Sequence, residues 1–193
     1  MQNPPSTFER LISQLSELED TLPNPQEVAN ILSKADISAA ELRPLLNFRK
    51  NGYTRNLVHR SQTFDVIVLC WAPNSGTPIH DHGDQLGWVR VLKGALEEVR
   101  FSTKGQPTKL DENTTWTPLV HSRKVQPADR SVDWVDKVHG IHQLKALDMQ
   151  TISLHIYSKP IDTCLVFAGE EGEINLKELE FDTTPDSRSK QLS

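Results

Sequence analysis

The stretch Ile79-His80-Asp81-His82 places two imidazoles two positions apart in a segment with the character of a β-strand. Side chains at positions i and i+2 of a strand point to the same face of the sheet. His80 and His82 can therefore bind one metal ion together, and an imidazole from a distant strand would complete a facial set. No aspartate or glutamate stands at a spacing that obviously completes the pair into a carboxylate-containing triad. That absence is as informative as the histidine pair itself.

The third ligand is sought in His139-Gly140-Ile141-His142, where two histidines compete. They stand three positions apart, so on a strand they would face opposite ways. Periodicity by itself does not choose between them. His59 and His121 lie in polar surroundings, and we interpret both as solvated histidines without a metal.

From about Tyr53 onward the chain alternates with a period of two, as half-buried strands do. Turn signals such as Pro73-Asn74-Ser75-Gly76 and Lys93-Gly94 separate the apolar stretches. Many short strands with regular turns and no helices between them predict a sandwich or barrel. The predicted fold class is therefore mainly β, a small antiparallel β-barrel or jelly roll. Its predicted strands include residues 66–71, 88–92, 96–101 and 152–157, with a further one at 173–181.

The first fifty residues follow a helical pattern instead. Ser6 and Ser38 each open a capping box, and Asn24 precedes a proline at a first helical position. We expect these α-helices to pack on the outside of the barrel. We predict one domain, residues 1–193, with a helical part (1–50), a barrel (51–181) and a disordered polar tail (182–193).

Composition narrows the function classes. Hydrophobic residues make up 36% and charged residues 24% of the chain, which is typical of a globular protein. A formal net charge of −5 without a cluster of basic residues argues against a nucleic-acid partner. The longest apolar run, residues 66–71, is too short to cross a bilayer, so we expect no membrane partner. Cys70 and Cys164 cannot form a disulfide framework and suit a reducing cytoplasm. We expect a monomer.

The histidine pair and the glycines around it resemble the first cupin motif. In that motif His-x-His is followed by an acidic ligand and later by a glycine; here Gly87 stands at the acidic position and Gly94 at the later one. Gly140-Ile141-His142 resembles the second cupin motif, which supplies one more histidine. This likeness favours His142 over His139 as the third ligand.

A set of six segments, in this order, makes the likeness more specific. Together they resemble the cysteine dioxygenase family of cupin-fold thiol dioxygenases, over roughly residues 40 to 170. The segments are residues 53–58, 69–71, 79–82, 140–142, 153–158 and 162–164. The resemblance implies that His80, His82 and His142 hold Fe(II), and that L-cysteine and O2 react there to give cysteine sulfinic acid. Three neutral imidazoles leave the charge of the ion uncompensated, so such a site favours an anionic thiolate ligand.

Arg55 and Tyr53 share one face of a predicted strand. A guanidinium matches a carboxylate with two parallel hydrogen bonds. In the family resembled, an arginine at this place binds the carboxylate of cysteine, whereas relatives acting on mercaptopropionate carry a glutamine. The resemblance therefore implies that Arg55, helped by Tyr53, binds the substrate carboxylate.

Ser153, His155 and Tyr157 form an entirely polar face between Leu154 and Ile156. In a barrel with a metal inside, such a face is expected to line the cavity. These groups can form a hydrogen-bond relay that orients the Tyr157 hydroxyl near substrate and oxygen. A serine hydrolase is the competing interpretation, but nothing here resembles a nucleophile elbow, and His155 has no acidic partner nearby in the sequence.

The chain departs from the expected pattern at three positions, one of which is Ala146, where the second cupin motif commonly ends in asparagine. Animal members carry a cysteine where Gly87 stands, and that cysteine is cross-linked to the tyrosine matching Tyr157; glycine predicts an uncrosslinked Tyr157. The family's Ser-Pro-Pro is Ser158-Lys159-Pro160 here, and a cis bond before a non-proline residue would cost about 2.5–4 kcal/mol.

Other functions stay open at the level of sequence. One is oxidation of another small thiol, such as 3-mercaptopropionate; Arg55 argues against cysteamine, which has no carboxylate. Another is a non-catalytic metal-binding cupin that binds or senses a small molecule. Because imidazole suits several metals, Ni or Zn could also occupy such a site.

Overall fold

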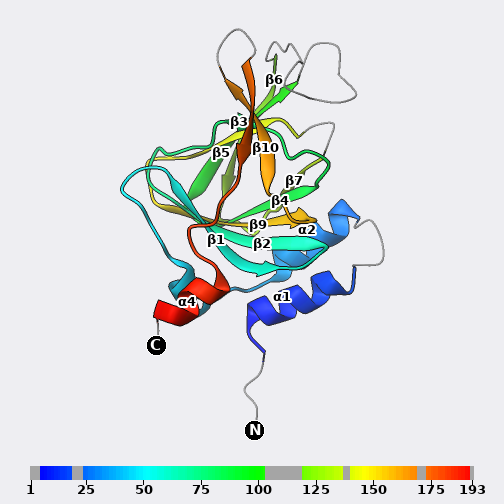
Figure 1. Cartoon of the computed structure of the whole chain (residues 1–193), viewed down its shortest axis with the longest axis vertical. Helices are drawn as coiled ribbons and strands as arrows, with labels where there is room; N and C mark the ends of the chain where they lie inside the picture. Colours follow the sequence, from blue (N-terminus) through cyan, green and yellow to red (C-terminus); the bar gives the residue numbers. More distant parts are fainter. Residues whose placement is uncertain (1–4, 19–23, 103–118, 137–139, 169–172, 192–193) are drawn as a thin grey trace.

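The computed structural model describes residues 5–18, 24–102, 119–136, 140–168 and 173–191. Two antiparallel sheets face one another, as a small antiparallel barrel of the cupin type requires (Figure 1). Sheet A has the order β1 (Tyr53–Arg60), β2 (Phe64–Trp71), β9 (Thr151–Ser158), β4 (Gly87–Lys93) and β7 (Asp133–Val135). Sheet B has the order β11 (Glu173–Glu178), β10 (Thr163–Ala168), β3 (Ile79–His80), β8 (His142–Ala146), β5 (Ala95–Ser102) and β6 (Leu119–Pro127). The predicted fold class is confirmed.

Strands β2 and β9 lie at the centre of sheet A and are covered on both faces. In β9 the apolar residues Ile152, Leu154 and Ile156 belong to the core beneath the helices, whereas Tyr157 belongs to the core between the sheets. Because strand side chains alternate between faces, this arrangement turns Ser153, His155 and Tyr157 inward together. The predicted polar inner face of this strand is therefore confirmed as a feature of the fold.

The N-terminal helices begin where their capping signals predict. α1 (Thr7–Ser16) and α3 (Ala39–Leu42) start with capping boxes at Ser6 and Ser38, and α2 (Pro25–Lys34) starts after Asn24. A short 3₁₀ helix, η1 (Arg43–Leu45), follows α3. Leu11 and Leu32, both almost fully buried, pack with the outer face of sheet A, and Figure 1 shows the helices on that side of the barrel. The helical layer thus closes one face and leaves the space between the sheets for the site.

The C-terminal segment differs from the predicted disordered tail of residues 182–193. Leu57 donates its backbone N–H to the Thr183 carbonyl (2.9 Å), and the helix α4 (Pro185–Gln191) follows. Arg188 also donates to the Leu57 carbonyl at 2.7 Å. The prediction is wrong for residues 182–191, because β1 is an edge strand whose free backbone groups bind this polar segment. Composition does not reveal such a partner.

The last strand is shorter than predicted, since β11 ends at Glu178 rather than at residue 181. In the part of the chain that the structure describes, no helix has the length and apolar character needed to cross a membrane.

Candidate metal centre and substrate cavity

Three histidines from distant parts of the chain meet between the sheets. β3 pairs with β8 so that His80 stands directly opposite His142. His82 completes the group, and the ligand atoms of the three imidazoles lie within 4.8 Å of one another. One metal ion can therefore reach all three. The structure brings together the three histidines that the sequence singled out; His139, the competing ligand, lies outside the described residues.

His82 reaches this place in a way that the strand pattern did not predict. β3 ends at His80, so the two histidines do not share one strand. Asp81 instead binds β10 twice: its N–H donates to the Leu165 carbonyl (3.1 Å), and its carboxylate accepts the Leu165 N–H (2.7 Å). These two hydrogen bonds fix the backbone at Asp81, and His82 then lies on the same side as His80.

The Nδ1 atom of each imidazole has an oxygen acceptor behind it. His80 Nδ1 donates to the Pro78 carbonyl (3.0 Å), and His82 Nδ1 donates to the Gly140 carbonyl (3.2 Å). His142 Nδ1 donates to Glu98 Oε1 (2.8 Å). Because these oxygens only accept, the proton of each neutral ring is on Nδ1 and the lone pair is on Nε2.

The Nε2 atoms therefore fit a metal ion. His142 Nε2 is buried and has no hydrogen-bond partner among the described residues. Burial, reinforced by the neighbouring imidazoles, lowers the pKa of His80 to about 3 and lowers that of His82 well below its usual value. At neutral pH these two rings are uncharged, which is the state that binds a metal.

Glu98 is a functional candidate that the sequence reasoning missed. It stands on β5, is 2% exposed, and accepts the hydrogen bond from His142. The expectation of histidines without any carboxylate therefore holds for the metal-facing atoms, but a carboxylate lies directly behind one ring. A signal was present: Glu98 stands two positions from Leu96, whose side chain is fully buried, so strand alternation turns both inward.

Arg55 and Tyr53 line the same cavity as the three histidines, together with His155, Tyr157 and Cys164. The Arg55 side chain is buried, and its Nη1 has no hydrogen-bond partner among the described residues. Its ring neighbour is Phe181, whose centroid lies 5.1 Å from the Arg55 Cζ. A buried guanidinium with an unused N–H is well suited to bind an anion.

Arg60, on the same strand, is an arginine whose guanidinium is paired with carboxylates of the chain. It donates from Nε and Nη2 to the two oxygens of Asp65, both at 2.8 Å, and from Nη1 to Asp162, also at 2.8 Å. Arg60 thus has its carboxylates within the chain, whereas no described carboxylate forms an ion pair with Arg55.

A buried relay holds His155, with a member that was not predicted. Trp71 Nε1 donates to Ser153 Oγ (2.8 Å), and Ser153 Oγ is hydrogen-bonded in turn to His155 Nε2 (2.7 Å). The other ring nitrogen of His155, Nδ1, is buried and has no partner among the described residues. Burial lowers the pKa of His155 to about 3, so the ring is neutral.

Tyr157 lines the cavity beside this relay without belonging to it. Its ring stacks 6.3 Å from His155 and 5.7 Å from His82, and within the described residues no hydrogen bond joins its hydroxyl to His155. The predicted relay thus ends at His155. Burial raises the pKa of Tyr157 to about 12, which keeps the hydroxyl protonated and able to donate.

Comparison with known proteins identifies the group to which this molecule belongs. Residues 1–170 match the profile of the family described as Cysteine dioxygenase type I. The chain belongs to this family. "Cysteine dioxygenase type 1" of Rattus norvegicus is 29% identical over 181 residues, covering 89% of this chain and 84% of the rat protein. "Cysteine dioxygenase type 1" of Danio rerio is 27% identical over 188 residues, covering 92% and 87% of the two chains.

Among solved structures, a conserved protein with a double-stranded β-helix domain from Klebsiella pneumoniae covers 82% of this chain and 99% of its own. Its sequence identity is 12% and its TM-score is 0.46.

This member of the cysteine dioxygenase family has Gly87 directly opposite Tyr157, on the paired strands β4 and β9. A Cβ atom at Gly87 would lie 3.3 Å from Cε1 of the Tyr157 ring and 3.2 Å from Val135 Cγ2. The backbone therefore presents the position of the animal cross-link, but the side chain that would make it is missing.

Three other positions considered in the sequence, Lys159, Cys70 and Cys164, are located by the structure. Within the described part of the chain no peptide bond is cis, and Lys159 adopts a positive φ of 66°. Cys70 is a buried core residue, as expected. Cys164 lines the cavity, and burial raises its pKa to about 11, so the thiol is protonated at neutral pH.

Proposed function

We propose that this chain is a cysteine dioxygenase that oxidises L-cysteine with O2 to cysteine sulfinic acid at a non-haem Fe(II) site. The observation that carries the proposal is the shared cavity. It contains three imidazoles, among them His142 with a buried Nε2, and a buried arginine; His142 Nε2 and Arg55 Nη1 have no hydrogen-bond partner among the described residues. A ligand with both a thiolate and a carboxylate matches the two ends of this cavity.

We assign His80, His82 and His142 as the iron ligands. Their Nδ1 hydrogen bonds support this role, because they orient all three rings before an ion binds. When bound, Fe(II) supplies the one-electron chemistry that lets O2 react with a thiolate. The sulfur is oxidised, both oxygen atoms end in the sulfinate, and no external reductant is needed.

We assign Arg55, with Tyr53 beside it, as the group that binds the substrate carboxylate. The guanidinium can donate two parallel hydrogen bonds, which position the thiol end of the amino acid toward the histidines. Tyr53 is held by the ring of Trp71 at a centroid distance of 4.8 Å, and burial raises its pKa, so it remains a neutral donor.

We assign orienting roles to Tyr157, His155 and Ser153. Ser153 holds the His155 ring through Nε2, and the buried Nδ1, which has no partner among the described residues, is placed to bind a substrate group. Tyr157 contributes a protonated hydroxyl and a ring that excludes water from the cavity.

Two further functions fit parts of the same site. A dioxygenase of 3-mercaptopropionate would use the same histidines, but the unpaired Arg55 favours the substrate for which the family carries arginine. A non-catalytic metal-binding cupin would also use the histidines. The buried nitrogens of Arg55 and His155 that have no partner among the described residues disfavour it, because metal binding alone does not require them.

The test is oxygen uptake by protein loaded anaerobically with Fe(II), with L-cysteine and 3-mercaptopropionate compared side by side. We expect one O2 consumed per sulfinate formed from cysteine. Arg55→Gln should lower kcat/KM for cysteine by about 10- to 150-fold, because hydrogen bonds to charged groups contribute about 1.5–3 kcal/mol. Arg60→Gln is the matched control, since Arg60 is already paired within the chain.

Preference for 3-mercaptopropionate would keep the iron site and overturn the assignment of Arg55. Tight iron binding without uptake of O2 with either thiol would favour the binding module. We also propose that the chain acts as a single-domain monomer in the cytoplasm. The free thiols of Cys70 and Cys164 support a reducing compartment.

A further inference from the structure

Glu98 has a carboxylate that is almost completely buried. Its side chain is 2% exposed, and burial of a charged group without partners is strongly unfavourable. Four side chains donate to it. His142 Nδ1 (2.8 Å) and Arg100 Nε (3.2 Å) reach Oε1, while Lys124 Nζ (3.3 Å) and Gln126 Nε2 (3.1 Å) reach Oε2. The fold thus supplies a complete set of donors for this one group.

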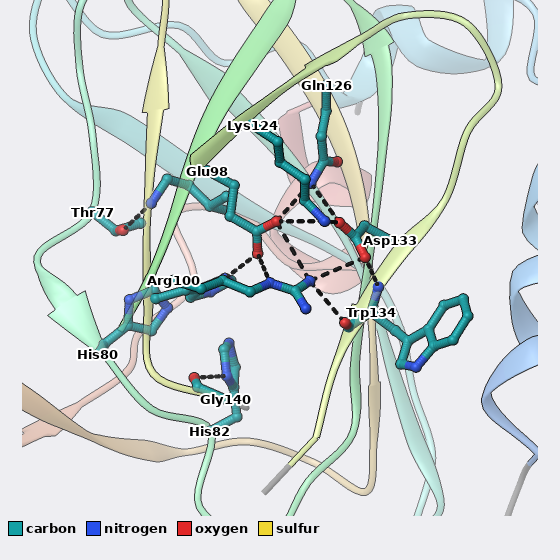
Figure 2. Close-up of polar contacts among 12 residues, drawn as sticks. Thr77, His80, His82, Glu98, Arg100, Lys124, Gln126, Asp133, Trp134 and Gly140 are labelled. Carbon is teal, nitrogen blue, oxygen red and sulfur yellow. Dashed lines mark hydrogen bonds and ion pairs between the residues drawn. The ribbon is translucent and has the colours of Figure 1, made fainter. Parts of the chain in front are cut away.

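Figure 2 shows Lys124, Gln126 and Asp133 gathered on the side of Glu98 away from His80 and His82. Arg100 also binds Asp133 (3.0 Å) and the Trp134 carbonyl (2.9 Å), and Lys124 forms an ion pair with Asp133. Strands β5, β6 and β7 therefore join around the carboxylate. Arg100 and Lys124 form ion pairs with the Glu98 carboxylate, which accepts the hydrogen bond from His142 Nδ1.

The three histidines differ in the group that accepts the hydrogen bond from Nδ1. His80 and His82 donate to backbone carbonyls, whereas His142 donates to a carboxylate. A charged acceptor makes a stronger hydrogen bond than a carbonyl and raises the electron density of the ring. Among the described residues, Glu98 is the one acidic side chain that hydrogen-bonds to any of the three.

We propose that Glu98 is a positioning residue of the metal centre. Its carboxylate orients His142 and holds the proton on Nδ1, so that Nε2 presents its lone pair to the ion. This inference rests on the proposed function, because it assumes that His80, His82 and His142 hold the iron.

The first experiment measures the dissociation constant of Fe(II), anaerobically and without thiol, by competition with a chelator. Glu98→Gln keeps the size of the side chain and an oxygen acceptor but removes the charge. We expect its affinity for Fe(II) to be about 10- to 100-fold lower than that of the wild type. Glu97→Gln is the matched control with unchanged affinity. Glu97 is the adjacent residue on β5, and its carboxylate forms an ion pair with Arg123 (3.6 Å) rather than a contact with the histidines.

The second experiment reports on His142 itself. In protein loaded with diamagnetic Zn(II) and labelled with ¹⁵N-histidine, the Nδ1 proton of one ring should resonate far downfield in the wild type and in Glu97→Gln. It should move upfield in Glu98→Gln, which a loss of general packing would not produce. If Glu98→Gln does not fold, Glu98→Asp, which retracts the charge by one methylene, should weaken Fe(II) binding and move the same resonance.

Equal Fe(II) affinity and an unmoved Nδ1 proton in the Glu98 variants would overturn the inference. A wild type that binds Fe(II) but does not oxidise thiols would overturn the proposed function instead. The role of Glu98 would then still be decided by the affinities and the resonance.

Discussion

The two sides of the cavity differ in how their buried nitrogen atoms are hydrogen-bonded. The metal wall, formed by His80, His82, His142 and Glu98, has every Nδ1 atom hydrogen-bonded to an acceptor. The substrate wall, formed by Tyr53, Arg55, His155 and Tyr157, keeps two buried nitrogens, Arg55 Nη1 and His155 Nδ1, that have no hydrogen-bond partner among the described residues.

The difference follows from what each wall is proposed to bind. A metal ion needs lone pairs that point in fixed directions. The imidazole rings that supply these lone pairs from Nε2 are therefore oriented by hydrogen bonds at Nδ1. An amino acid brings its own acceptors, so donors left open in a buried cavity are satisfied only when it binds. The comparison predicts that changes on the metal wall alter metal binding, while changes on the substrate wall leave it intact.

The largest effect is expected from His80→Ala. Removing one of three ligands should weaken Fe(II) binding by more than about 100-fold, the upper end of what the loss of an outer hydrogen-bond partner costs. Thiol oxidation should be lost with it. Chelator competition measures the affinity, and His59→Ala is the control that removes a histidine outside the site. An unchanged affinity of His80→Ala for Fe(II) would show that His80 is not a metal ligand.

A smaller effect concerns acid stability of the metal-free protein. Burial lowers the pKa of His155 to about 3, so the unfolded chain takes up a proton near pH 6.5 while the folded chain does not. This contribution to the free energy of unfolding is complete above pH 6.5. It is lost toward pH 3 at about 1.4 kcal/mol per pH unit. Urea unfolding between pH 7.5 and 5 should give a shallower pH dependence for His155→Gln than for the wild type. An unchanged slope would show that His155 is protonated in the folded state.

A still smaller effect is expected from Phe181→Leu. The ring lies 5.1 Å from the Arg55 Cζ, and a cation–π contact of this kind contributes about 0.5–1 kcal/mol. KM for cysteine should rise about two- to fivefold by the same estimate, with Fe(II) affinity unchanged. Steady-state kinetics and the chelator assay together test this separation. A parallel loss of iron would show that the two walls are coupled.

The smallest functional effect is expected from Gly87→Cys, which tests the geometry of Tyr157. The wild type should have the intact mass of its sequence. After incubation with Fe(II), cysteine and O2, Gly87→Cys should lose two hydrogens, because its Cβ would start 3.3 Å from the Tyr157 ring. The double variant Gly87→Cys/Tyr157→Phe is the control. A loss of two hydrogens in the wild type would contradict an uncrosslinked Tyr157.

Local patterns in the sequence were sufficient for much of the fold. Capping boxes predicted where the helices begin, and alternation predicted the inner face of β9, because both depend on neighbours within a few positions. The ordered segment after residue 181 was not predicted, since it is held by an edge strand more than a hundred residues away.

For the candidate site too, part was predictable from local sequence patterns and part depended on tertiary contacts. The sequence by itself determined which histidines, which arginine and which tyrosine were worth considering, because motif spacing is local information. Only the tertiary structure decided what stands behind each of them. Glu98 lies behind His142 and Trp71 behind Ser153, through hydrogen bonds between residues 44 and 82 positions apart. Such partners are set by how strands pair and sheets face one another, which the order of residues along one strand does not contain.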